Sequence, residues 1–338
     1  MARYLGVDLH RKVMTVCVRT ESGRTQLLTW SLKQVESFKK KLRKDDQVAV
    51  EATGNTRWFV EQIKDRVARV AVVDPNQFKV VSRSVKKTDA NDAQLLALFL
   101  HKDLLPEVRM KDKDQAQLAS LVQTRDKLVQ LRTTLKNQIS NIAAAHGVEL
   151  QKESLSSQKG LAWVLGAPWD GAVKLQLEVI TQQIRSLNEG IKKLEAQIRD
   201  LGSKLEGFEN LKSIKGIGDL SASILLSVIG DIKDFADEGK LASYFGIVPR
   251  VQQSADTLHS GRITKRGSKL GRTTLVQCAL IAQRYSPYLH EYYEKVKARR
   301  GTGKAIIATA RKLLGIIYNT LKEKWLFADF TNFVLVKS

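Results

Sequence analysis

Short apolar runs separated by turn-forming residues dominate the first part of the chain. The first three runs predict strands at Arg3–His10, Lys12–Arg19 and Thr25–Trp30, with a hairpin turn at Glu21-Ser22-Gly23. Because the connections between these runs are short, the three strands are expected to form an antiparallel meander.

Helical and strand patterns alternate after this meander. The predicted elements are an amphipathic stretch at Val35–Arg43, a strand at Val48–Glu51, a helix at Arg57–Val67, a strand at Arg69–Val73 and a helix at Asp89–His101. Asp74-Pro75 ends the last strand, because proline lacks the N–H group that a sheet ladder needs. Three strands followed by alternating helices and strands is the order of a ribonuclease-H-like mixed sheet, so an α/β fold is predicted.

The middle of the chain has a helical pattern over two long segments, Asp112–Ala145 and Val173–Leu205. Apolar residues such as Leu118 and Val122 recur at helical spacing, with glutamine and lysine between them. Glycines and prolines from Gly160 to Gly171 break the pattern and favour an antiparallel helical hairpin. This hairpin is either a spacer or oligomerising coiled coil, or a solvated bundle that packs on its own domain.

The remainder of the chain is mostly helical in pattern and predicts an all-α second domain. The predicted domains are a sheet domain at 1–105, a helical connector at 106–207 and a C-terminal domain at 208–338. In the last of these, a loop rich in small and basic residues is expected at Gln252–Lys269, followed by basic helices up to Trp325. The end, Phe327–Ser338, is predicted to be a strand or a docked tail.

Net charge indicates the kind of partner. The chain has 56 Lys and Arg against 35 Asp and Glu, a net charge of +21, which favours a polyanionic partner, with nucleic acid the leading candidate. Because 43% of the residues are hydrophobic and only five are proline, the charge belongs to a folded protein rather than to a disordered tail.

Other features exclude several classes of protein. Cys17 and Cys278 form no CxxC pair, which excludes a disulfide framework and a zinc ribbon. No apolar run reaches the roughly 20 residues that span a bilayer, and Met1–His10 lacks the pattern of a signal peptide, so a cytoplasmic protein is expected. The five histidines show no metal-binding spacing, so any metal is expected to be held by carboxylates.

Four acidic residues are placed to hold such a metal. Asp8 and Glu51 each end an apolar run, and Asp89 and Asp92 lie three residues apart at a helix start, so both face the same way. Four converging carboxylates require a cation, and oxygen ligands suit Mg²⁺ or Mn²⁺, which promote phosphoryl transfer. Taken singly, Asp89 also fits a helix N-cap and Asp8 a turn; only the ordered set favours the metal site.

Two segments of the second half suit contacts with phosphate groups. Ile214–Gly218 is similar to the hairpin of a helix-hairpin-helix element, although an ordinary glycine turn between packed helices explains it equally well. Five basic residues also fall within the eleven positions from Arg262 to Arg272. The residues expected to contact phosphates are Lys215, Arg250, Arg262, Lys265, Arg266, Lys269, Arg272, Arg299 and Arg300. A solvated surface is the alternative for them.

Taken together, the motifs resemble those of the IS-one-ten (IS110) family of insertion-sequence transposases, relatives of the Piv and MooV DNA invertases. The motifs that carry the resemblance are Gly6-Val7-Asp8, Glu51-Ala52-Thr53-Gly54, Lys87-Thr88-Asp89-Ala90-Asn91-Asp92-Ala93, Gly216-Ile217-Gly218, Gly246-Ile247-Val248-Pro249 through Ser254, and Lys265-Arg266-Gly267. The resemblance covers nearly the whole chain. One position departs from the family pattern, because Ala255 stands where glycine usually follows the serine.

The resemblance implies a RuvC-like N-terminal domain with a DEDD tetrad at Asp8, Glu51, Asp89 and Asp92, a coiled coil, and a C-terminal transposase domain. It implies that Ser254 attacks the DNA backbone and is held as a covalent phosphoserine, while Mg²⁺ on the tetrad of a neighbouring protomer assists. It further implies a tetramer of two dimers, association with the bacterial nucleoid, and a structured bridge RNA that pairs with target and donor DNA.

Two other functions stay open on the residues alone. A junction-resolving nuclease would use the tetrad to activate water, with Ser254 merely structural, and would leave hydrolysed ends without protein-linked DNA. A non-enzymatic nucleic-acid-binding protein would have carboxylates without a metal role. That protein would keep its function after the substitution Asp89→Ala.

Overall fold

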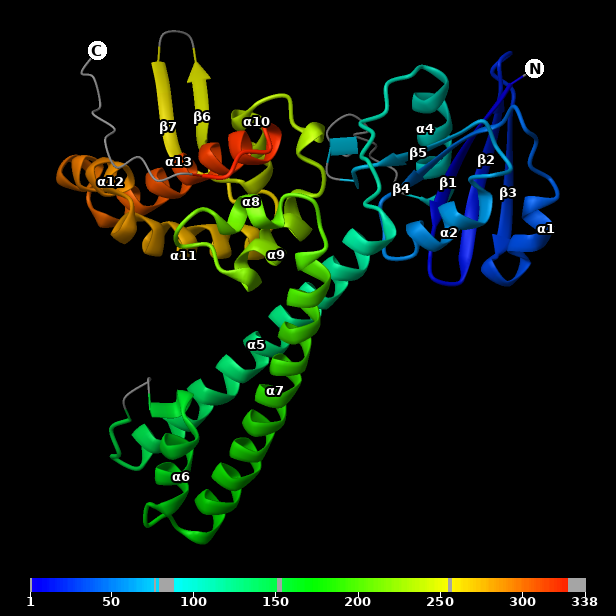
Figure 1. The fold of residues 1–338 in the computed structure, drawn as a ribbon. Coiled ribbons are helices and arrows are strands. Elements are labelled where there is room, and N and C mark those ends of the chain that lie inside the picture. The colour runs from blue at the N-terminus through cyan, green and yellow to red at the C-terminus, as the bar shows by residue number, and fades with distance from the viewer. Residues whose placement is uncertain (1, 76, 79–87, 151–153, 255–256, 328–338) are drawn as a thin grey trace. The chain divides into compact units, whose positions relative to one another are not determined.

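The chain forms two compact units, Met1–Met110 (unit 1) and Lys111–Ser338 (unit 2). The structure is a computed structural model that describes all residues except 1, 76, 79–87, 151–153, 255–256 and 328–338 (Figure 1). Unit 1 combines a sheet with helices, and unit 2 is mostly helical, as the sequence predicts. The division into three domains stays a prediction.

Unit 1 is built on a five-stranded mixed sheet. Its elements are β1 (Arg3–Leu9), β2 (Val13–Thr20), β3 (Thr25–Ser31), η1 (Leu32–Gln34), α1 (Val35–Lys39), β4 (Gln47–Glu51), α2 (Thr56–Ile63), β5 (Arg69–Val73) and α4 (Asp89–His101). The strand order is β3-β2-β1-β4-β5. Strands β1, β2 and β3 pair antiparallel, and β4 and β5 run parallel to β1. The predicted antiparallel meander and mixed sheet are confirmed.

The predicted amphipathic stretch and the first predicted helix of unit 1 both form helices shorter than the sequence pattern. The amphipathic stretch at Val35–Arg43 is helical only over α1, after a 3-10 turn capped by Ser31. Its end belongs to a turn, because the backbone N–H of Arg43 donates to the buried carboxylate of Asp46 at 2.8 Å. Arg3 donates to the same carboxylate from Nε and Nη2, so this turn is tied to β1. Helix α2 ends at Ile63 rather than at Val67.

Along β1, large apolar residues alternate with other residues, and the two sets lie on opposite faces of the sheet. Leu5, Val7 and Leu9 are buried against the helices α1 and α2 in the larger core cluster of this unit. Since successive side chains of a strand point to opposite faces, Gly6 and Asp8 lie on the other face, which α4 covers.

Helix α4 crosses β1 in direct backbone contact at Gly6. A Cβ atom on Gly6 would lie 2.1 Å from the carbonyl oxygen of Ala93 and 2.4 Å from the backbone nitrogen of Ala97. Only glycine permits this approach. Because Gly6 lies two residues before Asp8, the contact brings the N-terminal turn of α4 towards the end of β1.

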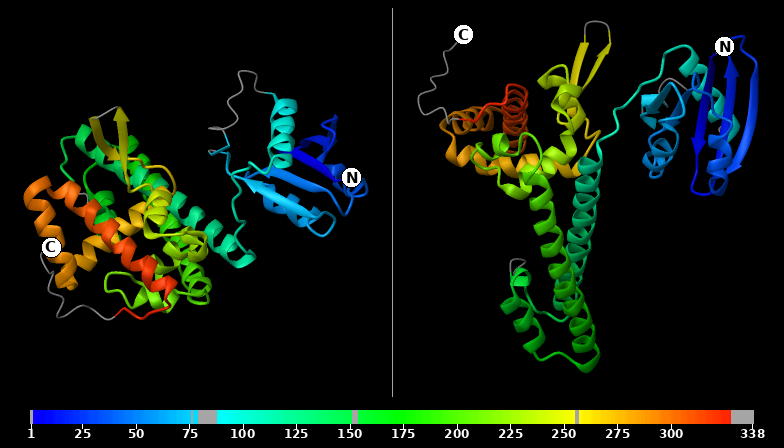
Figure 2. Two further views of the ribbon diagram at one scale, coloured as in Figure 1. Left: turned by 90° about the horizontal axis from the view of Figure 1, so that it is seen from above. Right: turned by 45° about the vertical axis from the view of Figure 1, so that its right-hand side comes forward.

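Unit 2 begins with a long antiparallel helical hairpin. It consists of α5 (Lys113–Ala145), η2 (Ser154–Ser156), α6 (Gln158–Gly166) and α7 (Gly171–Ser203). Arg125 Nε donates to Glu195 Oε1 at 3.0 Å, and Arg132 Nη1 donates to Asn188 Oδ1 at 2.8 Å, so α5 and α7 run in opposite directions (Figure 2, right). The predicted hairpin is therefore present, but Gly160 lies within α6 instead of breaking the helical pattern. Its role as an oligomerising coiled coil stays a prediction.

The rest of unit 2 is a helical body with one β-ribbon. Its elements are α8 (Phe208–Lys212), α9 (Asp219–Ile229), η3 (Ile232–Asp234), α10 (Glu238–Phe245), β6 (Pro249–Ser254), β7 (Thr257–Ile263), α11 (Lys269–Tyr285), α12 (Pro287–Arg300) and α13 (Thr302–Lys322). The prediction of a loop at Gln252–Lys269 is wrong over most of its length. These polar residues form a strand pair instead, because backbone pairing does not require an apolar pattern (Figures 1 and 2).

Three further expectations concern both units. Cys17 and Cys278 are both buried and unpaired. No helix within the described parts of the chain is long and apolar enough to cross a membrane. The predicted strand or docked tail at Phe327–Ser338 falls, after its first residue, outside the described residues.

Candidate active site

The two strand-end acids lie level with each other on neighbouring parallel strands. Val7 of β1 pairs with Val50 of β4, so the next residues, Asp8 and Glu51, share one register position. Because residues in register on parallel strands point to the same face, both side chains lie on the face that α4 covers. The hydroxyl of Thr56 donates to the Glu51 carbonyl at 2.6 Å and fixes the chain where β4 ends.

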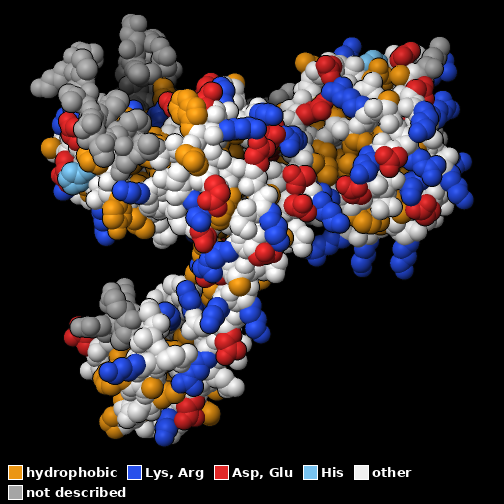
Figure 3. All heavy atoms as spheres, in the orientation of Figure 1, with side chains coloured by type: hydrophobic (Ala, Val, Ile, Leu, Met, Phe, Trp, Pro, Cys, Tyr) orange, Lys and Arg blue, Asp and Glu red, His pale blue; other side chains and the backbone are white. Residues whose placement is uncertain are grey.

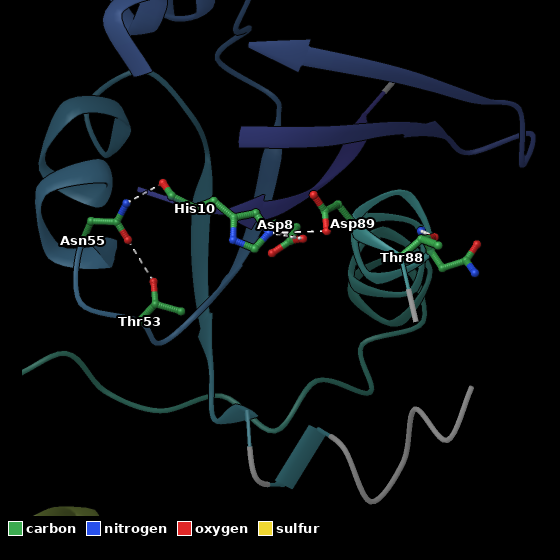
Figure 4. A network of polar contacts seen from close by, with 7 residues as sticks. Asp8, His10, Thr53, Asn55, Thr88 and Asp89 are labelled. Atoms are coloured by element: carbon green, nitrogen blue, oxygen red, sulfur yellow. Dashed lines mark hydrogen bonds and ion pairs between the residues drawn. The ribbon is translucent and has the colours of Figure 1, made fainter. Parts of the chain in front are cut away.

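The two helical acids occupy the first turn of α4. Thr88 caps this helix, its hydroxyl accepting from the backbone N–H of Asn91 at 3.3 Å (Figure 4). Asp89 and Asp92 follow the cap and benefit from the positive end of the helix dipole. The close approach of α4 at Gly6 directs this turn to Asp8.

A histidine joins the acids. The Nε2 atom of His10 lies 3.2 Å from Asp8 Oδ2 and 3.4 Å from Asp89 Oδ1 (Figure 4). Potential ligand atoms of Asp8, His10 and Asp89 all lie within 4.8 Å of one another. The expectation that carboxylates hold the metal stays a prediction, and the structure adds a histidine to the group of potential ligands. The histidine follows Asp8 by two residues where β1 ends, and that spacing was the available signal.

The electrostatics of this group favour an added positive charge. Burial raises the pKa of the Asp8 carboxyl, and the charges of Asp89 and Asp92 raise it further, while His10 opposes them. The negative charge of Asp8 in turn is the main cause of a raised pKa of His10. A cation between these residues would relieve the repulsion among the three carboxylates.

The donor set fits a divalent cation. Asp8 and Asp89 offer carboxylate oxygens to one position, and their side chains are 17% and 62% exposed, so water can complete the coordination. Glu51 and Asp92 lie on the same face but outside the close group of ligand atoms found among the described residues. The structure thus brings together two of the four predicted acids at ligand distance and keeps the others nearby.

The predicted nucleophile belongs to unit 2. Ser254 is the last residue of β6, where it pairs with Thr257 of β7. Strands β6 and β7 form a two-stranded sheet on their own, which stands away from the helices in Figures 1 and 2. Ala255, the departure from the family pattern, lies outside the described residues.

A tightly fixed loop presents two of the predicted basic residues. Between β7 and α11, the backbone N–H of Lys265 donates to the Gly246 carbonyl at 3.0 Å. A Cβ on Gly246 would lie 1.9 Å from the carbonyl oxygen of Arg266, and one on Gly267 would lie 1.9 Å from that of Tyr244. Both glycines have left-handed backbone angles, with φ of +67° and +93°. The loop therefore packs backbone against backbone and leaves the Lys265 and Arg266 side chains exposed.

The other predicted basic residues differ in their surroundings. The exposed ones are Lys215, Arg250, Arg262, Lys269, Arg299 and Arg300. Arg272 is half-buried, and its Nη1 donates to the Phe245 carbonyl at 2.9 Å, so it also holds the fold together. Lys and Arg side chains are spread over both units on the face shown in Figure 3. Phosphate contact stays a prediction for all of them, and for Arg272 the bond to the Phe245 carbonyl favours a role in the fold instead.

The glycine turn between α8 and α9 has a packing role. Gly216 has a φ of +106°, and a Cβ there would lie 2.7 Å from the backbone nitrogen of Ala282 in α11. This contact accounts for Gly216 without DNA, and the helix-hairpin-helix interpretation stays a prediction.

Comparison with known proteins identifies the class. Residues 5–145 match the DEDD_Tnp_IS110 family of transposases, and residues 208–294 match the Transposase IS116/IS110/IS902 family. The chain is 25% identical to the transposase for insertion sequence element IS1111A of Coxiella burnetii, over 95% of this chain and 90% of that protein. It is also 25% identical to a probable family 20 transposase of Pseudomonas aeruginosa, over 94% of this chain and 93% of the relative.

A third relative is named for the inversion of a gene. The pilin gene-inverting protein of Moraxella bovis is 25% identical to this chain, over 95% of this chain and 96% of that protein. Together with the site geometry, these matches define the protein as an enzyme, a DNA transposase. The chain belongs to the IS110 family of insertion-sequence transposases. Its DEDD domain and the acid cluster indicate dependence on a divalent metal.

Proposed function

We propose that this transposase excises and inserts its own mobile element by RNA-guided cleavage and strand exchange of DNA. In this proposal unit 1 is a RuvC-like domain whose tetrad Asp8, Glu51, Asp89 and Asp92 holds Mg²⁺, and Ser254 is the nucleophile. The observation that carries the proposal is the approach of Asp8 and Asp89, from a strand and a helix 81 positions apart, around one point.

The tetrad has a defined task in this proposal. The carboxylates of Asp8 and Asp89 would hold the cation, and Glu51 and Asp92 would add negative charge to the same face of the sheet. A bound Mg²⁺ would neutralise charge that develops on the phosphate oxygens. The strand order β3-β2-β1-β4-β5, with both β1 and β4 ending at the acids, supports the RuvC-like assignment.

Ser254 would form the covalent intermediate. Its hydroxyl gives up its proton as Oγ attacks a backbone phosphorus, the bond from phosphorus to the leaving oxygen of the DNA breaks, and that oxygen takes up a proton. A hydroxyl of another strand end then attacks the phosphoserine, which joins the strands and restores the serine. The exposed Lys265 and Arg266 follow β7, the strand paired with β6. This position supports a phosphate-binding role for them beside the β-ribbon that carries Ser254.

The partners in this proposal come from the family resemblance. They are target and donor DNA, a bridge RNA that pairs with both, and further copies of the chain in a tetramer of two dimers. The net charge of +21 supports binding to nucleic acid. The bacterial cytoplasm and nucleoid are the proposed location.

A metal-dependent nuclease without a covalent intermediate is the second candidate. The close group of ligand atoms lies wholly in unit 1, so activation of water there requires nothing from Ser254. The two functions predict different products, since hydrolysis leaves free ends and serine attack leaves protein-linked DNA.

One experiment separates the two. The full chain, the RNA that flanks its element, Mg²⁺ and labelled junction DNA are incubated together. Denaturing electrophoresis and mass spectrometry then search for a DNA-linked peptide. An adduct at Ser254 that is absent in Ser254→Ala and in Asp89→Ala supports the recombinase. Cleaved DNA without an adduct supports the nuclease.

Matched controls exclude general damage to the fold. Asp114 is an exposed first-turn acid of α5, so Asp114→Asn controls for loss of charge at a helix start. Ser260→Ala removes a hydroxyl from the neighbouring strand β7. Both variants are expected to form the adduct at the wild-type level.

A further inference from the structure

We propose that His10 is a ligand of the cation that the tetrad holds, and that its imidazole makes the site prefer Mn²⁺-type transition metals over Mg²⁺. The inference deepens the proposed function, because it rests on the tetrad holding a divalent cation. It concerns a residue outside the four acids, and it does not depend on serine chemistry.

The distances around the histidine suit a shared cation. Nε2 of His10 contacts two carboxylates, Asp8 at 3.2 Å and Asp89 at 3.4 Å. One N–H can be shared between both carboxylates in a three-centre hydrogen bond, and a cation that binds all three ligand atoms accounts for the same two contacts. Adjacent ligand atoms around a six-coordinate Mg²⁺ or Mn²⁺ lie roughly 3 Å apart, close to both observed distances.

The backbone of His10 is fixed independently of the acids. Its N–H donates to the Val13 carbonyl at 2.9 Å, and its carbonyl accepts from Asn55 Nδ2 at 2.9 Å. The Oδ1 atom of Asn55 accepts in turn from the hydroxyl of Thr53 at 3.0 Å (Figure 4). The loop after β4 therefore fixes the segment after β1. The position of His10 beside the acids is maintained by these backbone hydrogen bonds and not by the acids themselves.

Asn55 is consequently a positioning residue. It lies at the start of α2, four residues after Glu51, so one loop connects an acid of the tetrad with the support of the histidine. Groups that orient metal ligands in this way typically contribute tenfold or more to metal affinity.

The chemistry of imidazole sets the preference. Mg²⁺ is bound by oxygen ligands and keeps several of its waters, whereas imidazole suits transition metals. Relative to Mg²⁺, a set of two carboxylates and one imidazole thus favours a transition-metal ion, of which Mn²⁺ is the one most compatible with the carboxylates. Removal of the imidazole should lower the affinity for Mn²⁺ and change that for Mg²⁺ little.

The test uses the full chain and Mn²⁺ alone, without nucleic acid. Electron paramagnetic resonance measures free Mn²⁺ for the affinity, and electron spin echo modulation detects a ¹⁴N nucleus bound to the metal. Wild type should show the ¹⁴N coupling, and His10→Ala should lose it together with about tenfold in Mn²⁺ affinity. His290→Ala, in which an exposed histidine of α12 is removed, should match wild type in both measurements.

The variant Asn55→Ala distinguishes the positioning of His10 from the binding of the metal by its imidazole. It should weaken Mn²⁺ binding by about tenfold and keep the ¹⁴N coupling, because the imidazole is still present. Competition with Mg²⁺ should show that wild type prefers Mn²⁺ by about tenfold more than His10→Ala does.

Two results would overturn the inference. One is a wild-type protein that binds Mn²⁺ with no ¹⁴N coupling. The other is His10→Ala with unchanged Mn²⁺ affinity. Failure of the proposed function looks different: Mn²⁺ would bind with the ¹⁴N coupling intact, and no strand transfer or adduct would form with any divalent metal.

Discussion

The acid cluster of unit 1 and the serine-bearing ribbon of unit 2 are held in place in different ways. Asp8 and Glu51 belong to adjacent strands inside a five-stranded sheet, and α4 is fixed against that sheet by backbone contact at Gly6. Ser254 ends a strand whose sole partner in the described chain is β7.

This difference separates two ways of positioning a reactive group. A buried sheet fixes side chains through many neighbours, whereas an isolated strand pair is marginally stable alone and depends on what holds its base. In unit 2 the ribbon is fixed at the end where it joins the helices. There Gly246 and Gly267 allow the loop between β7 and α11 to pack against the end of α10. Unit 1 therefore carries a preformed site, and unit 2 carries its serine on a ribbon anchored at one end.

The largest expected effect comes from replacing one proposed catalytic residue in each unit. Asp8→Asn and Ser254→Ala should each reduce strand transfer by roughly a thousandfold, because each loses several kcal/mol of transition-state stabilisation. Mn²⁺ binding by the purified chain separates them, since only Asp8→Asn should weaken it. Equal loss of metal binding in both variants would contradict the assignment of the two groups to separate units.

The second effect tests the preformed site. Gly6→Ala places a methyl group against the backbone of α4 and should destabilise unit 1 by about 3 kcal/mol, with loss of Mn²⁺ binding. Gly54→Ala is the control, because a Cβ there meets nothing within 4 Å, and it should stay within about 0.5 kcal/mol of wild type. Chemical denaturation monitored on the full chain measures both. A stable Gly6→Ala protein with normal metal binding would contradict this account of α4.

The sheet and the acids of unit 1 could be predicted largely from the sequence. Period-two alternation in β1 and the apolar runs of β4 and β5 are strong signals, and acids after such runs indicate a sheet edge. His10 could not be assigned in this way. Its position two residues after Asp8 was a local signal, but its contact with Asp89, far along the chain, and its support from Asn55 are not encoded by local spacing.

The ribbon of unit 2, in contrast to the sheet of unit 1, could not be predicted from the sequence. Polar residues around Ser254 lack the alternation of a half-buried strand, because neither face of an isolated pair must be apolar. The glycines after α10 and β7 were visible, but the carbonyls they pack against belong to residues some twenty positions away. Local pattern therefore predicted a loop where backbone pairing makes strands.

The third prediction tests how the loop between β7 and α11 fixes the end of the ribbon that joins the helices. Gly267→Ala forces a Cβ into the Tyr244 carbonyl at a left-handed φ and should cost about 2 kcal/mol. Hydrogen exchange at the Lys265 amide, which donates to the Gly246 carbonyl, should then become faster, while Mn²⁺ binding by unit 1 stays normal. Gly303→Ala in α13 has open space around its Cβ and should leave this amide unchanged. Unchanged exchange in Gly267→Ala would show that the base is held by other contacts.

The smallest expected effect distinguishes basic residues that contact DNA from a basic residue that stabilises the fold. Lys265→Ala and Arg266→Ala should each weaken DNA binding a few-fold and lower the slope of log affinity against log salt by about 1, as expected for one lost phosphate contact. Arg272→Ala should keep the slope and instead lower stability by about 1.5 kcal/mol, because its guanidinium donates to the Phe245 carbonyl. Titrations at several salt concentrations measure the slope. A reduced slope in Arg272→Ala with unchanged stability would place this arginine at the DNA and remove it from the support of the basic loop.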